Sequence, residues 1–155
     1  MPIEIERKFL LKDDSWRKQA DPGKDYIQGY LVGSRQASVR VRIEGEQAYL
    51  NIKSATLGVR RQEYEYAIPL DDAREMLAQL CEQPLIEKTR YLIQAQGLCW
   101  EIDVFKGENA GLVVAEVELE SEQQQFVHPA WLGEEVSDDP RYYNVSLVKH
   151  PFKNW

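Results

Sequence analysis

Charged residues occupy every second position in one short segment after another along this chain. In the first such segment, near the N-terminus, Glu4, Glu6 and Lys8 alternate with Ile5 and Arg7 and precede further apolar residues. Successive side chains of a β-strand point to opposite faces, so each segment has one charged face and one mainly apolar face. Because the charges are of both signs and recur in many segments, the fold must give these faces a common location.

The same alternation recurs in the rest of the chain, at Arg40 and Arg42, Lys53, Glu63 and Glu65, Lys88 and Arg90, Glu101 and Asp103, and Glu116 and Glu118. Period-two alternation over about four to eight residues indicates β-strands. Gly45-Glu46 and Gln96-Gly97 have the composition of two-residue hairpin turns. We therefore predict about eight strands, near residues 2–11, 26–33, 37–45, 48–54, 61–69, 85–94, 98–107 and 112–120.

A closed antiparallel barrel gives both faces of these strands a location, because interior and exterior side chains alternate along every barrel strand. The charges would line a wet tunnel, and the apolar faces would lie outside. We predict an α+β chain dominated by β-structure: a closed eight-stranded antiparallel barrel with helices packed outside and a C-terminal helical segment. Helices are expected near 13–18 and over 71–80, where Asp71 would cap an apolar stripe. The tail, 141–155, would close one mouth.

Length and composition set limits on what this chain does. Its 155 residues predict a single domain, 1–155. A net charge of −7 argues against a nucleic-acid partner, because a phosphate backbone requires a basic surface. No signal-peptide pattern and no membrane-spanning run is found, so we expect no membrane partner and a cytoplasmic location. Cys81 and Cys99 are too few for a metal or disulfide framework. Both a monomer and a homodimer remain open.

The charged residues assigned to the tunnel form a basic set and an acidic set. The basic set is Lys8, Arg40, Arg42, Lys53, Lys88 and Arg90, and the acidic set is Glu4, Glu6, Glu63, Glu65, Glu116, Glu118 and Asp103. Arginine and lysine are natural ligands of phosphate oxygens. Carboxylates without Cys or His favour a hard cation such as Mg²⁺ or Mn²⁺. The two sets together predict phosphoryl-transfer chemistry.

Two other interpretations of the charged pattern fit the sequence less well. The chain has no Gly-rich phosphate loop, which argues against P-loop and Rossmann folds. The structural alternative is that the tunnel charges only pair with one another. A fully paired interior is a poor source of stability, however, because desolvation offsets much of the Coulomb attraction.

The ordered series of motifs resembles the CYTH superfamily, also called triphosphate tunnel metalloenzymes. Its N-terminal E-x-E-x-K signature corresponds to residues 4–8. The resemblance continues, over essentially the whole chain, through Arg40-Val41-Arg42, Lys53, Arg61-Gln62-Glu63-Tyr64-Glu65, Glu87-Lys88-Thr89-Arg90-Tyr91, Asp103, Glu116-Val117-Glu118, Gly133-Glu134-Glu135-Val136 and Arg141-Tyr142-Tyr143-Asn144. In length the chain is most similar to the small bacterial members that hydrolyse inorganic triphosphate.

This resemblance implies metal-dependent hydrolysis of a triphosphate, most simply inorganic tripolyphosphate to pyrophosphate and phosphate. It implies that the six basic residues bind this small-molecule substrate. It further implies roles for the acidic residues: the catalytic Mg²⁺ or Mn²⁺ on Glu4, Glu6, Glu116 and Glu118, a second metal or the attacking water at Glu63 and Glu65, and Asp103 in the acidic lining. Lys8 and Lys88 count with Glu63 and Glu65 as catalytic residues. Lys149 or Lys153 would reach the leaving phosphate.

Three alternatives to inorganic triphosphatase activity remain open at the level of the sequence. A class IV adenylate cyclase would use the same tunnel to convert ATP to cyclic AMP and pyrophosphate. A thiamine or nucleoside triphosphatase would hydrolyse an organic triphosphate. A non-catalytic polyphosphate-binding module would keep the basic lining without needing the metal carboxylates.

Overall fold

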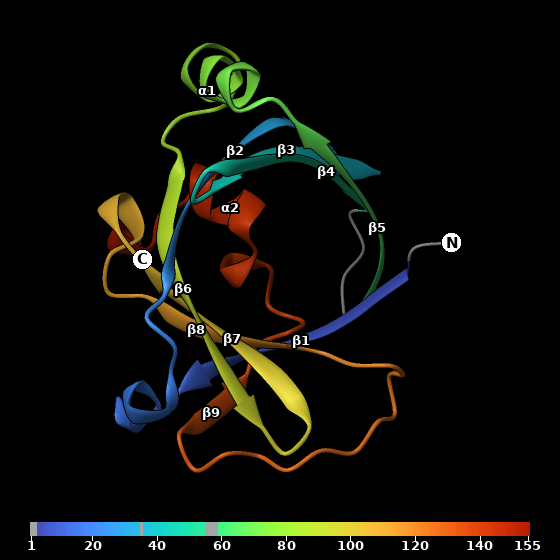
Figure 1. Cartoon of the computed structure of the whole chain (residues 1–155), viewed down its shortest axis with the longest axis vertical. Coiled ribbons are helices and arrows are strands. Elements are labelled where there is room, and N and C mark those ends of the chain that lie inside the picture. Colours follow the sequence, from blue (N-terminus) through green and yellow to red (C-terminus); the bar gives the residue numbers. More distant parts are fainter. Residues whose placement is uncertain (1–2, 35, 55–58) are drawn as a thin grey trace.

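The computed structural model describes residues 3–34, 36–54 and 59–155, and these form a closed antiparallel β-barrel (Figure 1). Pro2, the first residue of the predicted strand 2–11, lies outside the described residues. Strands follow the order β5-β4-β3-β2-β6-β7-β8-β1, and a pairing between β1 and β5 closes the ring. The predicted eight-stranded barrel is confirmed, and a ninth strand, β9, adds to it.

The barrel strands agree with the predicted segments to within a few residues. Their bounds are β1 Ile3–Leu11, β2 Lys24–Gly33, β3 Ala37–Glu44, β4 Gln47–Ser54, β5 Arg60–Ile68, β6 Ile86–Ala95, β7 Leu98–Phe105 and β8 Val113–Glu118. Both predicted hairpin turns are present, at Gly45-Glu46 between β3 and β4 and at Gln96-Gly97 between β6 and β7. Gln96 and Gly97 both have positive φ, 53° and 77°, as the tight two-residue turn requires.

Strand register brings the charged positions of neighbouring strands onto one face. Lys8 on β1 lies opposite Glu116 on β8, and Arg90 on β6 lies opposite Asp103 on β7. Residues directly opposite each other in an antiparallel pair project to the same side of the sheet. The alternation in each strand therefore produces one continuous charged inner surface in the closed barrel.

The ninth strand was not predicted from the sequence. β9, Leu132–Glu135, is four residues long and pairs with β1, where Phe9 lies opposite Glu135 and Leu11 opposite Leu132. The start of β1 pairs instead with β5. One edge of β1 is therefore shared between β5 and β9. A four-residue strand without alternating charge gives no period-two signal, so the sequence pattern does not predict β9.

The helix predicted over 71–80 is present as α1, Leu70–Gln79, and packs on the outside of the barrel (Figure 1). Its buried residues Ala73 and Leu77 form an apolar cluster with Val41 of β3 and Ala48 of β4. The prediction of Asp71 as N-cap is wrong, because the N-cap is Pro69 and Asp71 lies in the first turn. The carboxylate there still favours the helix through the helix dipole. The helical run expected near 13–18 is the 3-10 helix η1, Ser15–Gln19.

The C-terminal segment is helical and enters one end of the barrel. It consists of η3 (Pro140–Tyr142), α2 (Asn144–Lys149) and η4 (Phe152–Asn154), and a further 3-10 turn, η2 (Gly107–Asn109), precedes β8. Leu147 and Val148 of α2 form a buried cluster with Tyr30, Ile86 and Val114 from three barrel strands. In Figure 1, α2 lies within the outline of the ring. Asn144, Val145, Ser146 and Lys149 of α2 also line the cavity of the barrel, so this segment forms part of its boundary.

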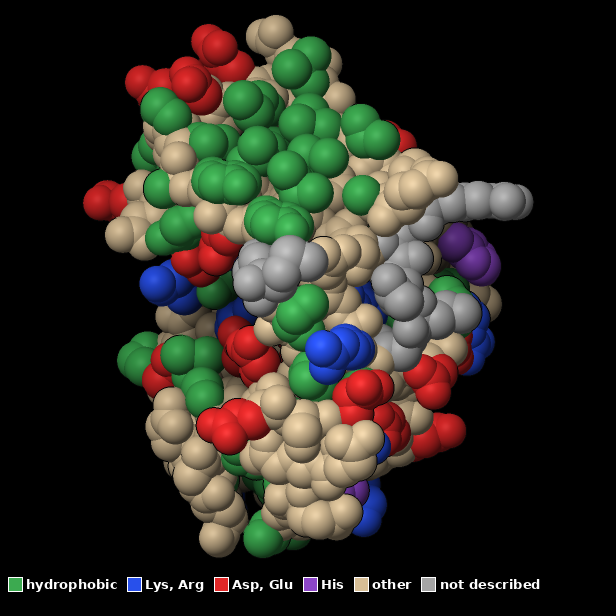
Figure 2. All heavy atoms as spheres, turned by 90° about the vertical axis from the view of Figure 1, so that its right-hand side faces the viewer, with side chains coloured by type: hydrophobic (Ala, Val, Ile, Leu, Met, Phe, Trp, Pro, Cys, Tyr) green, Lys and Arg blue, Asp and Glu red, His purple; other side chains and the backbone are tan. Residues whose placement is uncertain are grey.

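Most of the large apolar core lies outside the barrel wall. Trp100 is 1% exposed and makes edge contacts with Phe9, Phe126 and Trp131, with ring centroids 5.6–5.9 Å apart. On another face, hydrophobic side chains gather in the half of the molecule toward α1 (Figure 2). Tyr66 of β5, 55% exposed, is among the large apolar side chains that remain at the surface. The barrel is therefore apolar outside and charged inside, as the alternation predicted.

Replacing Trp100 by alanine tests the importance of this external core. We expect Trp100→Ala to lower the free energy of unfolding by about 3–5 kcal/mol, because a buried aromatic side chain is lost and a cavity remains. Leu80→Ala is the matched control, since Leu80 is 66% exposed, and we expect a change within about 0.5 kcal/mol. Urea unfolding followed by circular dichroism measures both, and equal losses would contradict the assignment of the core.

Candidate active site

The barrel encloses a cavity of about 870 Å³ whose lining is dominated by charged side chains. Of the predicted site residues, those on the lining are Glu4, Glu6, Lys8, Arg40, Arg42, Lys53, Glu63, Glu65, Arg90, Glu116 and Glu118. Lys88 and Asp103 are not on the lining; they lie behind it in the barrel wall, 1% and 0% exposed. The described lining residues include eight glutamates and seven lysines or arginines, so neither sign of charge dominates.

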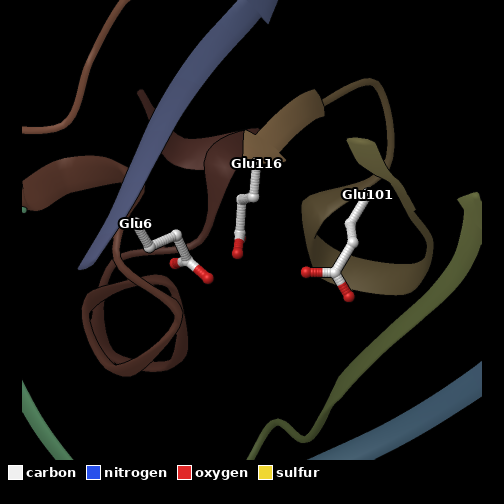
Figure 3. A group of neighbouring side chains, drawn as sticks. All are labelled: Glu6, Glu101 and Glu116. Carbon is white, nitrogen blue, oxygen red and sulfur yellow. The ribbon is translucent and has the colours of Figure 1, made fainter. Parts of the chain in front are cut away.

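Three carboxylates from neighbouring strands converge at one place on this lining. One oxygen from each of Glu6, Glu101 and Glu116 lies within 4.8 Å of the others. Figure 3 shows the side chains of Glu6 on β1, Glu116 on β8 and Glu101 on β7 directed toward a common space. Among the described residues, this is the one group of three potential metal ligands.

The pKa values of these carboxyls reflect their crowding. Burial, followed by the charge of Glu116, raises the pKa of Glu6 well above its ordinary value. Burial would also raise the pKa of Glu116, but the positive charges of Lys8, Arg90 and Lys88 hold it well below its ordinary value. Burial raises the pKa of Glu101 as well. Close carboxylates of this kind repel one another unless a proton or a cation lies between them.

A divalent cation fits this donor set. Three carboxylates supply only oxygen ligands and strong negative charge, which hard cations such as Mg²⁺ and Mn²⁺ prefer over softer metals. Glu6, Glu101 and Glu116 would hold the ion. Glu118, two residues after Glu116 on β8, also lines the cavity. The cation would offset the charge of Glu116, which adds to burial in raising the pKa of Glu6.

A second acidic group lies beside Lys53. The Nζ of Lys53 is 3.4 Å from an oxygen of Glu4, and the amide of Asn51 donates to Glu63 over 3.2 Å. Burial raises the pKa of Glu4, whereas burial of Glu63 is outweighed by contact with Glu4 and the charges of Lys53 and Arg40, so its pKa is lowered. Glu63 is therefore available as an ionised acceptor on the tunnel lining.

The cations of the lining differ in how far they are neutralised. Arg42 pairs with Glu65 and with Glu44, the latter at 3.7 Å, and lies over the ring of Tyr49. Arg40 lies two residues before Arg42 on β3 and points to the same face. It is 8% exposed and forms no ion pair with the described residues. Its Nε has no hydrogen-bond partner among them. A buried guanidinium without a partner is costly unless a ligand completes it.

Lys88, Arg90 and Asp103 form an ion-pair cluster in which Lys88 and Asp103 are buried and Arg90 reaches the cavity lining. Both oxygens of Asp103 accept: from Lys88 Nζ at 2.7 Å, and from Arg90 Nε and Nη2 at 2.7 and 2.9 Å. Burial lowers the pKa of Lys88 to about 8, although Asp103 favours its charged form. In the structure, then, Asp103 holds two cations; its predicted role as a metal ligand and the predicted catalytic role of Lys88 stay predictions.

Lys8 joins the acidic group to the C-terminal segment. Its Nζ lies 3.6 Å from Glu116 and donates to the main-chain carbonyl of Tyr142 over 3.0 Å. The ring of Tyr143 lies 5.8 Å from the same ammonium and 5.0 Å from the guanidinium of Arg61. The entry of the C-terminal chain into the barrel thus fixes the position of a predicted catalytic lysine.

Sequence reasoning omitted several residues of this lining. Glu101 lies two residues before Asp103, so the alternation predicts that both point into the barrel. It is not part of any of the motifs shared with the CYTH superfamily. Arg61 is likewise on the lining, in step with Glu63 and Glu65. Of the two candidate tail lysines, Lys149 lines the cavity, whereas Lys153 lies outside it and pairs with Glu108.

The fold is a closed barrel, and its cavity is lined by cations and carboxylates together. These two features are typical of enzymes that act on phosphate groups inside a β-barrel. The family model of the CYTH domain matches residues 2–148, and the chain belongs to the CYTH domain family. It is 49% identical to an inorganic triphosphatase of Acetivibrio thermocellus over 155 residues, which is 100% of this chain and 99% of that protein. It is 40% identical to an inorganic triphosphatase of Nitrosomonas europaea over 150 residues, 94% of this chain and 96% of that protein.

A solved structure supports the same relationship. The crystal structure of an inorganic triphosphatase superposes on this chain with a TM-score of 0.66 at 37% sequence identity. The match covers 96% of this chain and 95% of the other. The resemblance to triphosphate tunnel metalloenzymes is therefore confirmed at the level of both sequence and fold.

Neutralising Asp103 tests its role in the buried ion-pair cluster. We expect Asp103→Asn to lower the free energy of unfolding by about 3–5 kcal/mol near neutral pH, because Lys88 and Arg90 lose their shared carboxylate. The pKa of Asp103 lies below its ordinary 3.8 because Arg90 and Lys88 outweigh the effect of burial. Its stabilisation is therefore present above pH 3.8 and is lost as the pH falls through the folded-state pKa.

The difference between wild type and Asp103→Asn should accordingly shrink in strongly acidic solution, as measured by urea unfolding at several pH values. Asp25→Asn is the control, because Asp25 pairs with Lys106 at 2.9 Å on the surface and such pairs contribute at most about 1 kcal/mol. An Asp103→Asn variant as stable as Asp25→Asn at neutral pH would contradict this account.

Proposed function

We propose that this protein is a divalent-metal-dependent triphosphatase that hydrolyses inorganic tripolyphosphate to pyrophosphate and phosphate. Two relatives at 40% and 49% identity are both inorganic triphosphatases, and they align with this chain over nearly their whole length. Their agreement supports the inorganic substrate over the nucleotide and thiamine alternatives.

The observation that carries the proposal is the buried guanidinium of Arg40, which forms no close ion pair with a carboxylate of the described residues. Among the predicted basic residues, Lys8, Arg42, Lys53, Lys88 and Arg90 each contact a carboxylate of the chain. Arg40 has no such contact among the described residues and faces the cavity at 8% exposure. Its charge acts on Glu63 at longer range, but a buried guanidinium without a close ion pair is available to an anionic ligand, and this supports a bound polyphosphate.

Charge balance supports a metal as a second ligand. Eight glutamates and seven cations on the described lining nearly cancel, so a bound triphosphate alone would leave the cavity strongly negative. A divalent ion held by Glu6, Glu101 and Glu116 would offset part of this negative charge, and we propose Mg²⁺ or Mn²⁺ because the donors are all carboxylate oxygens. When bound, such an ion neutralises phosphate oxygens and stabilises the charge that develops on them.

The residues of the chain then take distinct roles in hydrolysis. Arg40, Arg42, Lys53 and Arg90 bind and orient the phosphate oxygens, and Lys8 contributes a further positive charge beside Glu116. Glu63, which is ionised and lies opposite Lys53 across β4 and β5, would orient the attacking water as a hydrogen-bond acceptor, with Glu65 beside it. Glu4 and Glu118 complete the acidic lining. Most of the catalysis comes from positioning and electrostatics, as phosphoryl transfer requires.

The non-catalytic alternative is disfavoured by a specific arrangement. A polyphosphate-binding module needs only cations, and three converging carboxylates would weaken its affinity for an anion. The group formed by Glu6, Glu101 and Glu116 is therefore unexpected in a binding module and expected in a metal-dependent enzyme.

The location of the protein is a separate question. No helix of the described residues has the length and hydropathy to cross a membrane. We propose a cytoplasmic location, which the unpaired thiols of Cys81 and Cys99 support.

The proposal is tested by measuring phosphate release from tripolyphosphate and from ATP, each with Mg²⁺, with Mn²⁺ and with a chelator. We expect metal-dependent release from tripolyphosphate that greatly exceeds release from ATP. Formation of cyclic AMP from ATP would instead identify a cyclase. Tripolyphosphate that binds tightly with chelator present but is not hydrolysed with either metal would identify a binding module.

Glu116→Gln locates the activity in the acidic group, and we expect it to lose turnover by at least about 100-fold, because a ligand and a charge are removed together. Glu120→Gln is the matched control, since Glu120 continues the alternation of β8 but is exposed and does not line the cavity. Full activity in Glu116→Gln would contradict the proposed site.

A further inference from the structure

Arg90 presents a difficulty for phosphate binding, because carboxylates already occupy all three of its guanidinium nitrogens. Its Nε and Nη2 donate to Asp103 at 2.7 and 2.9 Å, and its Nη1 donates to Glu101 at 2.8 Å. The guanidinium is only 15% exposed. These contacts use three of the five N–H donors of the guanidinium, but its positive charge is already neutralised by two carboxylates, so a phosphate oxygen has to compete with them for Arg90.

The two carboxylates differ in how easily they release Arg90. Asp103 is 0% exposed and uses both oxygens to hold Arg90 and Lys88, so breaking its contact with Arg90 would remove two hydrogen bonds from a buried carboxylate that a ligand cannot reach. Glu101 holds only one nitrogen, its side chain is 29% exposed, and it lines the cavity. Glu101 is therefore the contact that a ligand can replace.

Glu101 also has a second possible partner on the same lining. One of its oxygens lies within 4.8 Å of oxygens from Glu6 and Glu116, and Figure 3 shows the three side chains converging from β7, β1 and β8. Two features thus meet at one carboxylate: an ion pair with a predicted phosphate-binding arginine and a position in the proposed cation site.

We infer that Glu101 is shared between the cation site and Arg90, so that it ligates the divalent cation and frees Arg90 for a phosphate oxygen. This inference rests on the proposed function and adds to it a residue that couples cation binding to anion binding. In the absence of a cation, Glu101 neutralises Arg90 and disfavours the anion. With its charge directed to a cation, Glu101 leaves Nη1 of Arg90 as a donor at the cavity surface. Coupling between two ligands must be reciprocal, so the anion also favours the cation.

The test measures two binding affinities of the full-length chain by calorimetry: Mn²⁺ without anion, and tripolyphosphate in the presence of chelator. For Glu101→Gln we expect Mn²⁺ affinity to fall by about 10- to 100-fold, because a ligating group is lost. We expect its metal-free tripolyphosphate affinity to rise, because Arg90 is no longer neutralised. A change of opposite sign in the two affinities is not expected from a merely structural role.

Glu44→Gln is the matched control. Glu44 also lines the cavity and pairs with an arginine, Arg42, at 3.7 Å, but it is outside the three-carboxylate group. It removes the same charge, and we expect it to leave Mn²⁺ affinity within about twofold of the wild type, well short of the loss expected for a ligand. Glu101→Asp keeps the charge but shortens the side chain, so we expect it to weaken Mn²⁺ binding too. Circular dichroism verifies that each variant is folded.

The outcomes separate this inference from the function on which it rests. A wild-type chain that binds Mn²⁺ and hydrolyses tripolyphosphate, with a Glu101→Gln variant that binds Mn²⁺ equally well, overturns the role of Glu101 alone. Equal losses of Mn²⁺ affinity in Glu101→Gln and Glu44→Gln overturn it as well, because general electrostatics then explains the effect. A wild-type chain that binds no Mn²⁺ overturns the proposed metal dependence together with the inference.

Discussion

The structure depends on one electrostatic constraint: a small closed barrel has to keep many charges of both signs inside a wall of β-strands. Charges removed from water are costly unless each finds a partner. The chain meets this requirement by strand register, which places Lys8 opposite Glu116 and Arg90 opposite Asp103. Closure of the ring by β1 and β5 then brings the acidic and basic strands around one cavity.

The ion pairs of the interior are tight in the barrel wall and looser on the cavity lining. The tight pairs support the fold, and the looser ones leave charges that can bind a ligand. In the wall, Asp103 neutralises Lys88 and Arg90 and is inaccessible. On the lining, Lys53 and Glu4 are in looser contact at 3.4 Å, and Arg40 has no carboxylate partner among the described residues. Buried apolar clusters stabilise the barrel, and the one around Trp100 lies outside the wall. The interior is therefore free to retain charges that serve a ligand.

Much of this arrangement was predictable from the sequence, because a period-two pattern fixes which side chains share a face. The strands, the hairpin turns and the inward position of the charged residues all follow from that periodicity. The pattern does not fix which inward charges become partners, since this depends on register between strands distant in sequence. It consequently gave no reason to separate Asp103 from the glutamates, nor to group Glu101 with Glu6 and Glu116. The short strand β9 and the cap at Pro69 depend on local contacts that leave no periodic signal.

The most direct test of this account compares stability and binding in one variant, Arg40→Met. If the buried charge of Arg40 serves a ligand, its replacement by an apolar side chain of similar length should leave the free energy of unfolding unchanged or higher, because an uncompensated charge is removed. The same replacement should weaken tripolyphosphate binding by about 10- to 100-fold, which corresponds to a lost charge-assisted hydrogen bond of about 1.5–3 kcal/mol. A variant that is clearly less stable but binds tripolyphosphate as tightly as the wild type would show that the charge serves the fold and would contradict the account.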